Sequence, residues 1–372
     1  MNHGGDDWRI RAEINHAALH HNAIILRAAL GKDLEILAVV KANGYGHGGP
    51  AVARTLAPLV EQFGVATYEE ALEIKQAAPD HDILVLSPCL PAERRAVVQA
   101  GFIPVVSSTE EAMAYANLAH TSTVPIHLCI DTGMGRIGIW QDEALTKARS
   151  IAALPRIVVE SVSTHLPVAD TDSDFTEAEL EFWMALVDQL RPILPQAKFH
   201  ALNSAASLRQ PQYGADRIRP GLALYGISPW SEFPYQLQPA MTLKTRITLV
   251  RQVGIGRGVS YGRDFITDQP MRIATLAMGY ADGYPRQSSN RGAEVLIRGQ
   301  RCPVLARITM DQFMVDVTHL PANLEPGEEV VLFGRQNQAE ISVHEVAAWS
   351  GTITWDILTR LGRRVEVVHQ LA

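Results

Sequence analysis

A lysine ends an apolar run near the N-terminus, in the stretch LAVVKANGYGHG that extends from Leu37 to Gly48. An apolar strand behind Lys41 would desolvate its amine and lower its pKa, which favours the neutral amine that forms a Schiff base with a carbonyl compound. Tyr45 and three glycines follow the lysine, and no acidic residue stands in the stretch. A lone lysine at such a place is more often a solvated strand end. Its chemistry therefore depends on the groups that the fold places opposite it.

Other residues able to do chemistry follow later apolar runs. They are Arg136, His165, Asn203, Ser204, Arg219, Gly221 and Leu222. A hydroxyl and a glycine turn with exposed backbone N–H groups can bind a phosphate. A phosphate site opposite a Schiff-base lysine fits pyridoxal 5′-phosphate (PLP), although a sugar-phosphate aldolase would use similar groups.

Eight short apolar runs alternate with amphipathic segments between Glu35 and Ser228. The runs are EILAVVK, QFGVAT, DILVLSP, FIPVVSS, VPIHLCID, IVVESVSTH, KFHALNS and DRIRPGLALYG. Continuous apolar strands separated by helices are typical of parallel strands covered on both faces. The count of eight predicts an α/β fold, a (β/α)₈ barrel of the TIM type, whose sites lie at the carboxyl ends of the strands. The residues named above stand at those ends.

The pattern changes to strands and turns after Pro239. TLKTRITLV alternates, EVLIRGQRCPVLARI predicts a hairpin that turns at Arg298, Gly299 and Gln300, and GEEVVLFG predicts another strand. The N-terminal WRIRAEI also alternates, and we expect it to join this second sheet. The predicted organisation is an N-terminal strand in residues 1–14, a PLP-binding barrel in 15–238 and a C-terminal, mostly β domain in 239–372.

Composition excludes several classes of partner. The chain of 372 residues is 47% hydrophobic and 20% charged, with a net charge of -7, which argues against nucleic acid or an anionic membrane as the main partner. No stretch approaches about 18 uninterrupted apolar residues and the N-terminus has no apolar signal region, so we expect a cytoplasmic protein. The cysteines Cys89, Cys129 and Cys302 are too far apart to suggest a disulfide framework or a metal site.

Eight motifs occur in a fixed order between about Trp8 and Val365. They are VVKANGYGHG, IDTGMGRIG, STHLPVADTD, HALNSAASL, DRIRPGLALYG, VSYG, GYADGYPR and CPVLARITMDQFMVDV. In this order they resemble alanine racemase, the PLP-dependent family that interconverts L- and D-alanine and supplies D-alanine for peptidoglycan. The resemblance implies a small amino acid as substrate. It also implies a head-to-tail homodimer, in which the C-terminal domain of one subunit completes the barrel site of the other.

The resemblance implies two bases on opposite faces of the substrate Cα, Lys41 and, from the other subunit, Tyr261. Inversion of a stereocentre requires removal of a proton on one face and donation on the other, which two bases achieve without rotating the intermediate. The other implied roles are His165 at the hydroxyl of the catalytic tyrosine; Arg219, backed by His200, at the pyridine nitrogen; Tyr45, Asn203, Ser204, Gly221 and Leu222 at the cofactor and its phosphate; Arg136 and the Met310 backbone N–H at the substrate carboxylate; Tyr280 at the entrance; and Asp311 in support.

An arginine at the pyridine nitrogen would shape the chemistry. A guanidinium is a permanent donor that does not readily release a proton. The ring nitrogen is then expected to stay unprotonated and the ring to be a weaker electron sink, which favours racemisation over transamination. Of the two arginines in DRIRPG, we expect Arg219 to take this role and Arg217 to be structural.

Two positions depart from the family pattern. Many members have a carbamylated lysine that supports the arginine of DTGMGR, and this chain has Cys129 there, so we expect Arg136 to be held by a bound anion or another side chain. Trp355 replaces a tyrosine that contributes to the phosphate site and the pocket wall. An indole has a single N–H and more bulk, which leaves the range of substrate sizes open.

The sequence leaves several alternative functions open. The most similar alternative is a racemase that acts on serine, lysine or arginine. The related decarboxylases oppose the pyridine nitrogen with a carboxylate rather than an arginine, and the related non-catalytic PLP-binding proteins would lack the roughly 130 residues after the barrel. His165 and His200 would also suit hydrogen-bonded core positions, and Tyr280 a turn.

Overall fold

The computed structural model describes residues 8–30, 34–119, 122–213, 215–230 and 236–371. It divides into two compact units. The barrel unit comprises Ala18–Gly44 and Gly48–Gln238. The β unit comprises the described residues up to Ala17, the short segment Tyr45–His47 and the chain from Pro239 onward. The first seven residues of the predicted N-terminal segment lie outside the described residues.

Eight parallel strands form the sheet of the barrel unit. They are β2 (Glu35–Val39), β3 (Gln62–Val65), β4 (Asp82–Val85), β5 (Ile103–Val106), β6 (Val124–Asp131), β8 (Ile157–Ser163), β9 (Lys198–His200) and β10 (Arg217–Ile218). They pair in the order β10-β2-β3-β4-β5-β6-β8-β9, and a parallel bridge between Asn203 and Arg219 links the two ends of the sheet. Each of the eight predicted strands is present, and the predicted fold is confirmed as a nearly closed parallel barrel.

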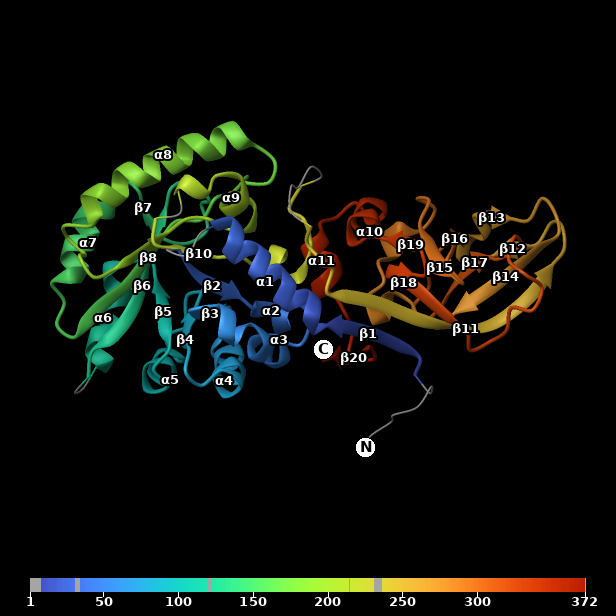
Figure 1. Cartoon of the computed structure of the whole chain (residues 1–372), viewed down its shortest axis with the longest axis horizontal. Coiled ribbons are helices and arrows are strands. Elements are labelled where there is room, and N and C mark those ends of the chain that lie inside the picture. The colour runs from blue at the N-terminus through green and yellow to red at the C-terminus, as the bar shows by residue number, and fades with distance from the viewer. Residues whose placement is uncertain (1–7, 31–33, 120–121, 214, 231–235, 372) are drawn as a thin grey trace. The chain divides into compact units, whose positions relative to one another are not determined.

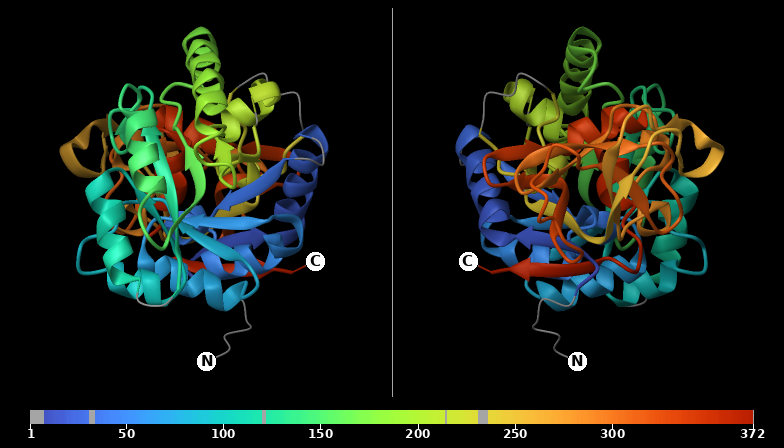
Figure 2. Two further views of the ribbon diagram at one scale, coloured as in Figure 1. Left: turned by 90° about the vertical axis from the view of Figure 1, so that its left-hand side faces the viewer. Right: turned by 90° about the vertical axis from the view of Figure 1, so that its right-hand side faces the viewer.

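Helices lie on the outside of this sheet (Figures 1 and 2). They are α1 (His16–Leu30), α3 (Gly49–Leu56), α4 (Tyr68–Ala77), α5 (Arg94–Gln99), α6 (Thr109–Leu118), α7 (Ala144–Ala152), α8 (Ser173–Leu190) and α9 (Ser204–Arg209). Five short elements also belong to this part of the chain. They are the helical turns α2 (Lys41–Tyr45), η1 (Ala57–Leu59), η2 (Pro211–Tyr213) and η3 (Leu222–Tyr225) and the strand β7 (Ile139–Trp140). The inner face of α8 buries Leu180, Trp183 and Val187, as its 3.6-residue spacing predicts.

A nine-stranded sheet forms the β unit. Its strands pair in the order β19 (Ala339–Ile341), β18 (Glu329–Gln336), β15 (Glu294–Ile297), β16 (Gln300–Leu305), β17 (Phe313–Asp316), β14 (Met271–Leu276), β11 (Met241–Val253), β1 (Ile10–Asn15) and β20 (Glu366–Gln370). β1 pairs antiparallel with β11 and parallel with β20, and its alternation buries Ile10, Ala12 and Ile14. The N-terminal alternating stretch is therefore a strand of this sheet.

The remaining elements of the β unit are short. They are the hairpin β12 (Gly258–Val259) and β13 (Phe265–Ile266), the turns η4 (Tyr261–Arg263), η5 (Tyr280–Asp282) and η6 (Arg286–Ser288), and the helices α10 (Val343–Ser350) and α11 (Thr354–Thr359). The predicted hairpin between β15 and β16 turns at Arg298 (φ 54°) and Gly299 (φ 79°). Two successive left-handed residues are typical of a tight hairpin turn.

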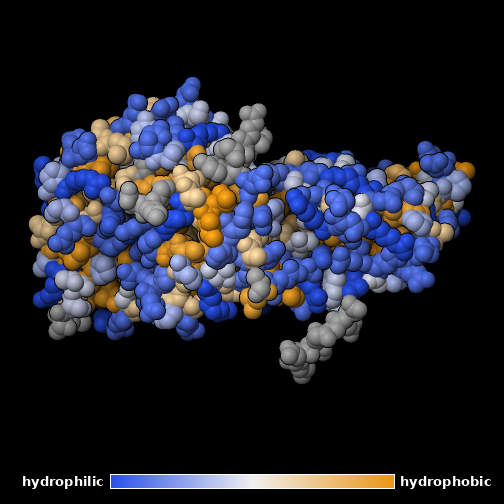
Figure 3. Space-filling view, viewed as in Figure 1, coloured by the Kyte–Doolittle hydropathy of each residue, from blue (hydrophilic) through white to orange (hydrophobic). Residues whose placement is uncertain are grey.

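The surface is mixed in character. On the face shown in Figure 3, hydrophilic residues are interspersed with hydrophobic ones. Among the described residues, no helix combines the length and the apolar character that a bilayer crossing requires.

Candidate active site

Lys41 stands at an abrupt change of backbone direction. The four residues after it have left-handed dihedrals: Ala42 (φ 52°), Asn43 (φ 54°), Gly44 (φ 62°) and Tyr45 (φ 52°). The left-handed helical conformation costs roughly 1–2 kcal/mol per non-glycine residue. Such strain persists where surrounding contacts fix it, and it occurs preferentially at functional sites.

Local hydrogen bonds hold this left-handed turn. The backbone N–H of Gly44 donates to the carbonyl of Val40 at 2.8 Å, and that of Gly48 donates to the carbonyl of Asn43 at 2.9 Å. The Asn43 side-chain oxygen accepts from the backbone N–H of Gly49 at 2.8 Å. The turn is thus closed on itself before helix α3 begins.

The surroundings of Lys41 favour its neutral amine. Burial lowers the pKa of Lys41, and the positive charge of Arg136 lowers it further, while the carboxylate of Glu70 raises it. The net direction is downward, which is the direction expected for a nucleophilic amine.

Hydrogen-bond donors converge on Ser204, the first residue of α9. Its hydroxyl oxygen accepts from the backbone N–H groups of Gly221 at 2.9 Å and of Ala223 at 3.3 Å. Asn203 caps α9, because its side-chain oxygen accepts from Ala205 N–H and Ala206 N–H. Gly221 and Leu222 open the turn η3 beside them. Because the Ser204 oxygen accepts from Gly221 N–H and Ala223 N–H, its own O–H can donate to an acceptor such as a phosphate.

Arg219 is almost completely buried, with 7% of its surface exposed. Its Nη1 donates to the ring Nδ1 and the carbonyl of His200, and its Nη2 donates to the carbonyls of Thr164 and Ala201. Burial lowers the pKa of Arg219 to about 10, so the guanidinium remains charged at neutral pH. None of these bonds uses Nε, and no described residue accepts from it, so this N–H is available to an acceptor such as a pyridine nitrogen.

Neutral histidines surround this arginine. Burial and the charges of Arg219, Arg136 and Lys41 lower the pKa of His165 to about 3. The pKa of His200 is also well below its usual value, mainly through burial and then through Arg219. Since His200 accepts at Nδ1, its proton lies on Nε2. The ring of His127 stacks on His200 with 5.0 Å between centroids.

Arg217, two residues before Arg219, has a different environment. It donates to the carboxylates of Glu35 and Glu160 and to the side-chain oxygen of Gln62. These bonds occupy its Nε and both Nη groups, which supports the structural role expected for Arg217.

The loop that carries Arg136 is held through its backbone. Asp131 accepts from the N–H groups of Gly133 at 3.0 Å, Gly135 at 3.1 Å and Arg136 at 3.1 Å. Cys129 is buried and its pKa is raised to about 11, chiefly by that burial, so the thiol is neutral and supplies no charge to support Arg136. No described residue accepts from the guanidinium of Arg136.

Three of the predicted residues in the β unit are exposed: Tyr261 at 71%, Met310 at 53% and Tyr280 at 40%. Tyr280 and Met310 are joined through one turn, since Tyr280 N–H donates to Thr309 O and Ala281 N–H donates to Met310 O. The exposure of these side chains contrasts with the burial of Ser204 and Arg219 in the barrel unit.

The residue before Tyr261 is strained. Ser260 has φ 61° and ψ -173°, a region that is essentially restricted to glycine. Its hydroxyl donates to the carbonyl of Arg307 at 2.6 Å, and the Arg307 guanidinium pairs with the carboxylate of Asp264. These contacts fix the turn η4, on which Tyr261 lies.

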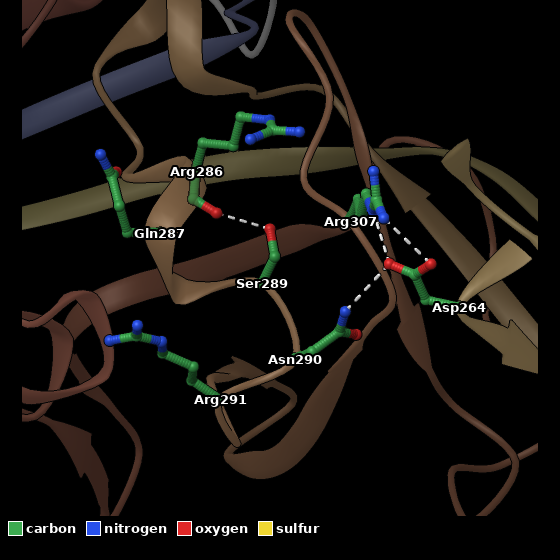
Figure 4. Close-up of a pocket in the computed structure, with 7 residues that line it drawn as sticks. All are labelled: Asp264, Arg286, Gln287, Ser289, Asn290, Arg291 and Arg307. Atoms are coloured by element: carbon green, nitrogen blue, oxygen red, sulfur yellow. Dashed lines mark hydrogen bonds and ion pairs between the residues drawn. The ribbon is translucent and has the colours of Figure 1, made fainter. Parts of the chain in front are cut away.

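A polar hollow of about 340 Å³ adjoins this ion pair (Figure 4). It is lined by Asp264, Arg286, Gln287, Ser289, Asn290, Arg291 and Arg307. In Figure 4 the carboxylate of Asp264 bonds both Arg307 and the Asn290 amide. Among the residues drawn, no carboxylate is bonded to the guanidinium of Arg286 or of Arg291.

The supporting residues are placed as follows. Asp311 accepts from Arg364 at 2.7 Å, and Trp355 lies half-buried on α11. Tyr45 is buried and its pKa is raised to about 12 by that burial, so its hydroxyl is neutral.

Two residues that support the site were not predicted from the sequence. They are Glu70 and Asp131, whose carboxylates bond backbone N–H groups beside Lys41 and Arg136. The only signal for Glu70 was its place three residues after Thr67, the N-cap of α4.

Comparisons with known proteins decide the family. The description "Alanine racemase, N-terminal domain" matches residues 14–229, and "Alanine racemase, C-terminal domain" matches residues 240–369. The chain belongs to the alanine racemase family. It is 39% identical to the alanine racemase of Desulforamulus reducens, with 97% of this chain and 98% of the relative covered, and 37% identical to that of Halothermothrix orenii, with 95% of each covered.

Solved structures agree with this assignment. The alanine racemase of Clostridium difficile has a TM-score of 0.91 and 32% identity, with 98% of this chain and 96% of that chain covered. The alanine racemase of Bartonella henselae, solved with covalently bound pyridoxal phosphate, has a TM-score of 0.89 and 28% identity over 97% of this chain and 99% of that chain. The protein is accordingly an isomerase that interconverts L- and D-alanine and depends on PLP.

The described residues fit this cofactor. Lys41 has the lowered pKa that attachment to an aldehyde requires. The O–H of Ser204, whose oxygen accepts from Gly221 N–H and Ala223 N–H, suits the phosphate, and the Nε–H of Arg219 suits the ring nitrogen.

Proposed function

We propose that two copies of the chain share each active site and that racemisation uses two bases, Lys41 of one subunit and Tyr261 of the partner subunit. The observation that carries this proposal is the exposure of Tyr261, 71% of whose surface is open, on a turn fixed by a strained Ser260. An exposed tyrosine directly after a strained residue is not explained by the packing of its own unit. It is explained if it acts in the site of another copy.

The chain's residues would divide the work as follows. PLP, when bound, withdraws electrons from the substrate Cα and so acidifies its proton. Lys41 would exchange a proton on one face of that carbon, and Tyr261 of the partner subunit on the other. Neutral His165 would accept a hydrogen bond from the tyrosine hydroxyl, since its pKa near 3 keeps the imidazole uncharged.

Other groups would bind and orient. Ser204, Gly221 and Leu222, with Tyr45 and Asn203, would hold the phosphate. Arg136 and the backbone N–H of Met310 of the partner subunit would bind the substrate carboxylate, and Tyr280 of the partner subunit would restrict substrate size. Arg219, positioned by His200, would donate to the ring nitrogen without protonating it. Asp311 and Trp355 would have supporting roles.

The cellular role follows from the reaction. We further propose that the enzyme acts in the cytoplasm and supplies D-alanine for peptidoglycan. Growth of a racemase-deficient bacterium without added D-alanine, restored by this chain but not by Lys41→Ala, would support that role.

Mixing of two inactive variants tests the shared site. If Lys41→Ala and Tyr261→Phe subunits associate at random, half of the dimers contain one of each, and one of the two sites in each such dimer is intact. We expect about a quarter of the wild-type activity after co-refolding, against almost none for either variant alone. The absence of any recovery, with mixed dimers verified by mass spectrometry of differently tagged subunits, would contradict a shared site.

A further inference from the structure

The left-handed turn after Lys41 has an external support. The backbone N–H of Ala42, its first residue, donates to Oε1 of Glu70 at 2.7 Å. Glu70 lies in the first turn of α4, and its own N–H donates to the hydroxyl of Thr67. Residues 28 positions apart in sequence are therefore joined at the point where the chain leaves β2.

The second oxygen of the same carboxylate is also engaged. Oε2 of Glu70 accepts from the backbone N–H of Ala66 at 2.8 Å, and Ala66 directly follows β3. β2 and β3 are neighbouring parallel strands. One carboxylate thus ties together the carboxyl ends of two adjacent barrel strands, on the side where the fold places its site.

Only a carboxylate can make both bonds. Each partner is an N–H donor, so both side-chain oxygens must accept. Glutamine has one oxygen and one NH₂ group, and it would oppose a donor with a donor at one of the two positions. Aspartate is one methylene shorter. The two bonds together require glutamate at position 70.

Glu70 also acts on Lys41 by its charge. The charged groups whose fields act on the Lys41 amine are Arg136, which lowers its pKa, and Glu70, which raises it. Arg136 comes from the loop after β6 and Glu70 from α4. Glu70 therefore limits the decrease that burial and Arg136 produce.

We propose that Glu70 is a positioning residue for Lys41: by accepting from Ala42 and Ala66, it holds the left-handed turn that presents the lysine amine to the site. This inference rests on the proposed role of Lys41 as the cofactor-binding base. It assigns a function to a residue that does not touch the reacting atoms and acts through the backbone.

Glu70→Gln, compared with Glu69→Gln, tests the proposal. Glu69 is exposed and stands in the same helical turn, and its replacement by glutamine removes the same charge, but its side chain bonds no described residue of the lysine turn. We expect kcat of the PLP-loaded Glu70→Gln enzyme to fall roughly 10- to 100-fold, as an error of about 1 Å in placing a reacting group can produce. Glu69→Gln should stay within about twofold of wild type.

Two readouts separate positioning from general stability. Hydrogen exchange of the Ala42 amide or of the Ala66 amide, measured by mass spectrometry on the PLP-loaded enzyme, should speed up in Glu70→Gln only, because glutamine can accept from just one of the two. In the full-length protein prepared without PLP, labelling of Lys41 by acetic anhydride should shift its midpoint to lower pH, because the carboxylate that raised the pKa is gone. Unchanged exchange and labelling, with only the melting temperature lowered, would overturn the proposal in favour of a purely structural role.

A second variant covers the case in which Glu70→Gln folds poorly. Ala42→Gly relieves the left-handed strain, because glycine adopts positive φ freely, and the exposed Ala42 loses no packing. If Glu70 acts by enforcing that turn, Glu70→Gln should reduce kcat less in the Ala42→Gly background than in wild type. We expect the two reductions to differ by a factor of roughly five. An equal reduction in both backgrounds would contradict the proposal.

Failure of this inference can be told apart from failure of the proposed function. A fully active Lys41→Ala would refute the role of Lys41 itself. An inactive Lys41→Ala together with a Glu70→Gln indistinguishable from Glu69→Gln would refute only the role of Glu70.

Discussion

The barrel unit and the β unit differ in how exposed some of their candidate site residues are. In the barrel unit Arg219 is 7% exposed and Ser204 is 6% exposed, and both are fixed by several hydrogen bonds. In the β unit Tyr261 is 71% exposed and Met310 is 53% exposed, and their positions are fixed through the backbone of their turns. Arg219 and Ser204 are buried by their own fold, whereas Tyr261 and Met310 are exposed.

This difference has a consequence for mutagenesis. Removing a buried, hydrogen-bonded group should reduce both stability and activity, because partners inside the fold lose their bonds. Removing an exposed group should reduce activity alone. Loss of activity and loss of stability should therefore be coupled at Arg219 and Ser204 of the barrel unit and uncoupled at Tyr261 and Met310 of the β unit.

The largest effect is expected for Lys41→Ala. Loss of a positioned base reduces kcat by about 10²–10⁴-fold, and loss of the cofactor attachment point adds to this. The visible absorption band of the PLP-treated protein should also disappear. Lys147→Ala, on α7, serves as the control, and a PLP-treated wild type without any such band would contradict the assignment of Lys41.

Tyr261→Phe should separate activity from stability. We expect kcat for conversion of L-alanine to fall by about 10²–10⁴-fold, with PLP affinity nearly unchanged and the unfolding free energy within about 0.5 kcal/mol of wild type. Chiral chromatography and urea denaturation measure the two quantities. A parallel loss of PLP binding and activity would argue against a base and for a structural residue.

Arg219→Ala should reduce both activity and stability. Its guanidinium serves four acceptors, namely the ring and carbonyl of His200 and the carbonyls of Thr164 and Ala201. Each buried acceptor left without a donor costs about 1–3 kcal/mol, so the unfolding free energy should fall by about 3 kcal/mol or more. A change as small as that of Tyr261→Phe would remove the contrast between the units.

The smallest effect concerns pH. The pKa of His165 is lowered from 6.5 to about 3 in the folded chain, so between these values the unfolded chain binds more protons. This histidine's contribution to stability is complete above pH 6.5 and is lost as the pH falls toward 3, by at most about 1.4 kcal/mol per pH unit. The unfolding free energy should therefore differ less between pH 7.5 and pH 5.0 in His165→Gln than in wild type. The exposed-residue control His20→Gln should show the wild-type difference.

Much of the fold was predictable because it depends on local patterns. The eight apolar runs correspond to eight strands, since a buried parallel strand needs a continuous apolar segment. The hairpin at Arg298 and Gly299 follows from two alternating segments separated by a short stretch that contains a glycine, which adopts positive φ freely. Strand order also predicted which residues stand at the carboxyl ends, including Lys41, Ser204 and Arg219.

The supports of the site were not predictable in the same way. A left-handed turn that includes Ala42 and Tyr45 contradicts the preferences of these two residues, and Ser260 adopts a conformation typical of glycine. Tertiary hydrogen bonds maintain both conformations, and no local pattern encodes them. The replacement at Cys129 was visible in the sequence, but only the structure shows that Asp131 holds the Arg136 loop through its backbone.

The sequence by itself determined the barrel, the family and the identity of the candidate catalytic residues, because periodicity and motif order are properties of the chain. Tertiary structure decided which carboxylate lies beside Lys41. The opening stretch offers none, and Glu70 reaches the lysine turn only because β2 and β3 pair in parallel and α4 begins beside their ends. Charges and donors distant in sequence act on a group only once folding has brought them within a few ångströms, and so the environment that tunes a reactive lysine is a property of the fold.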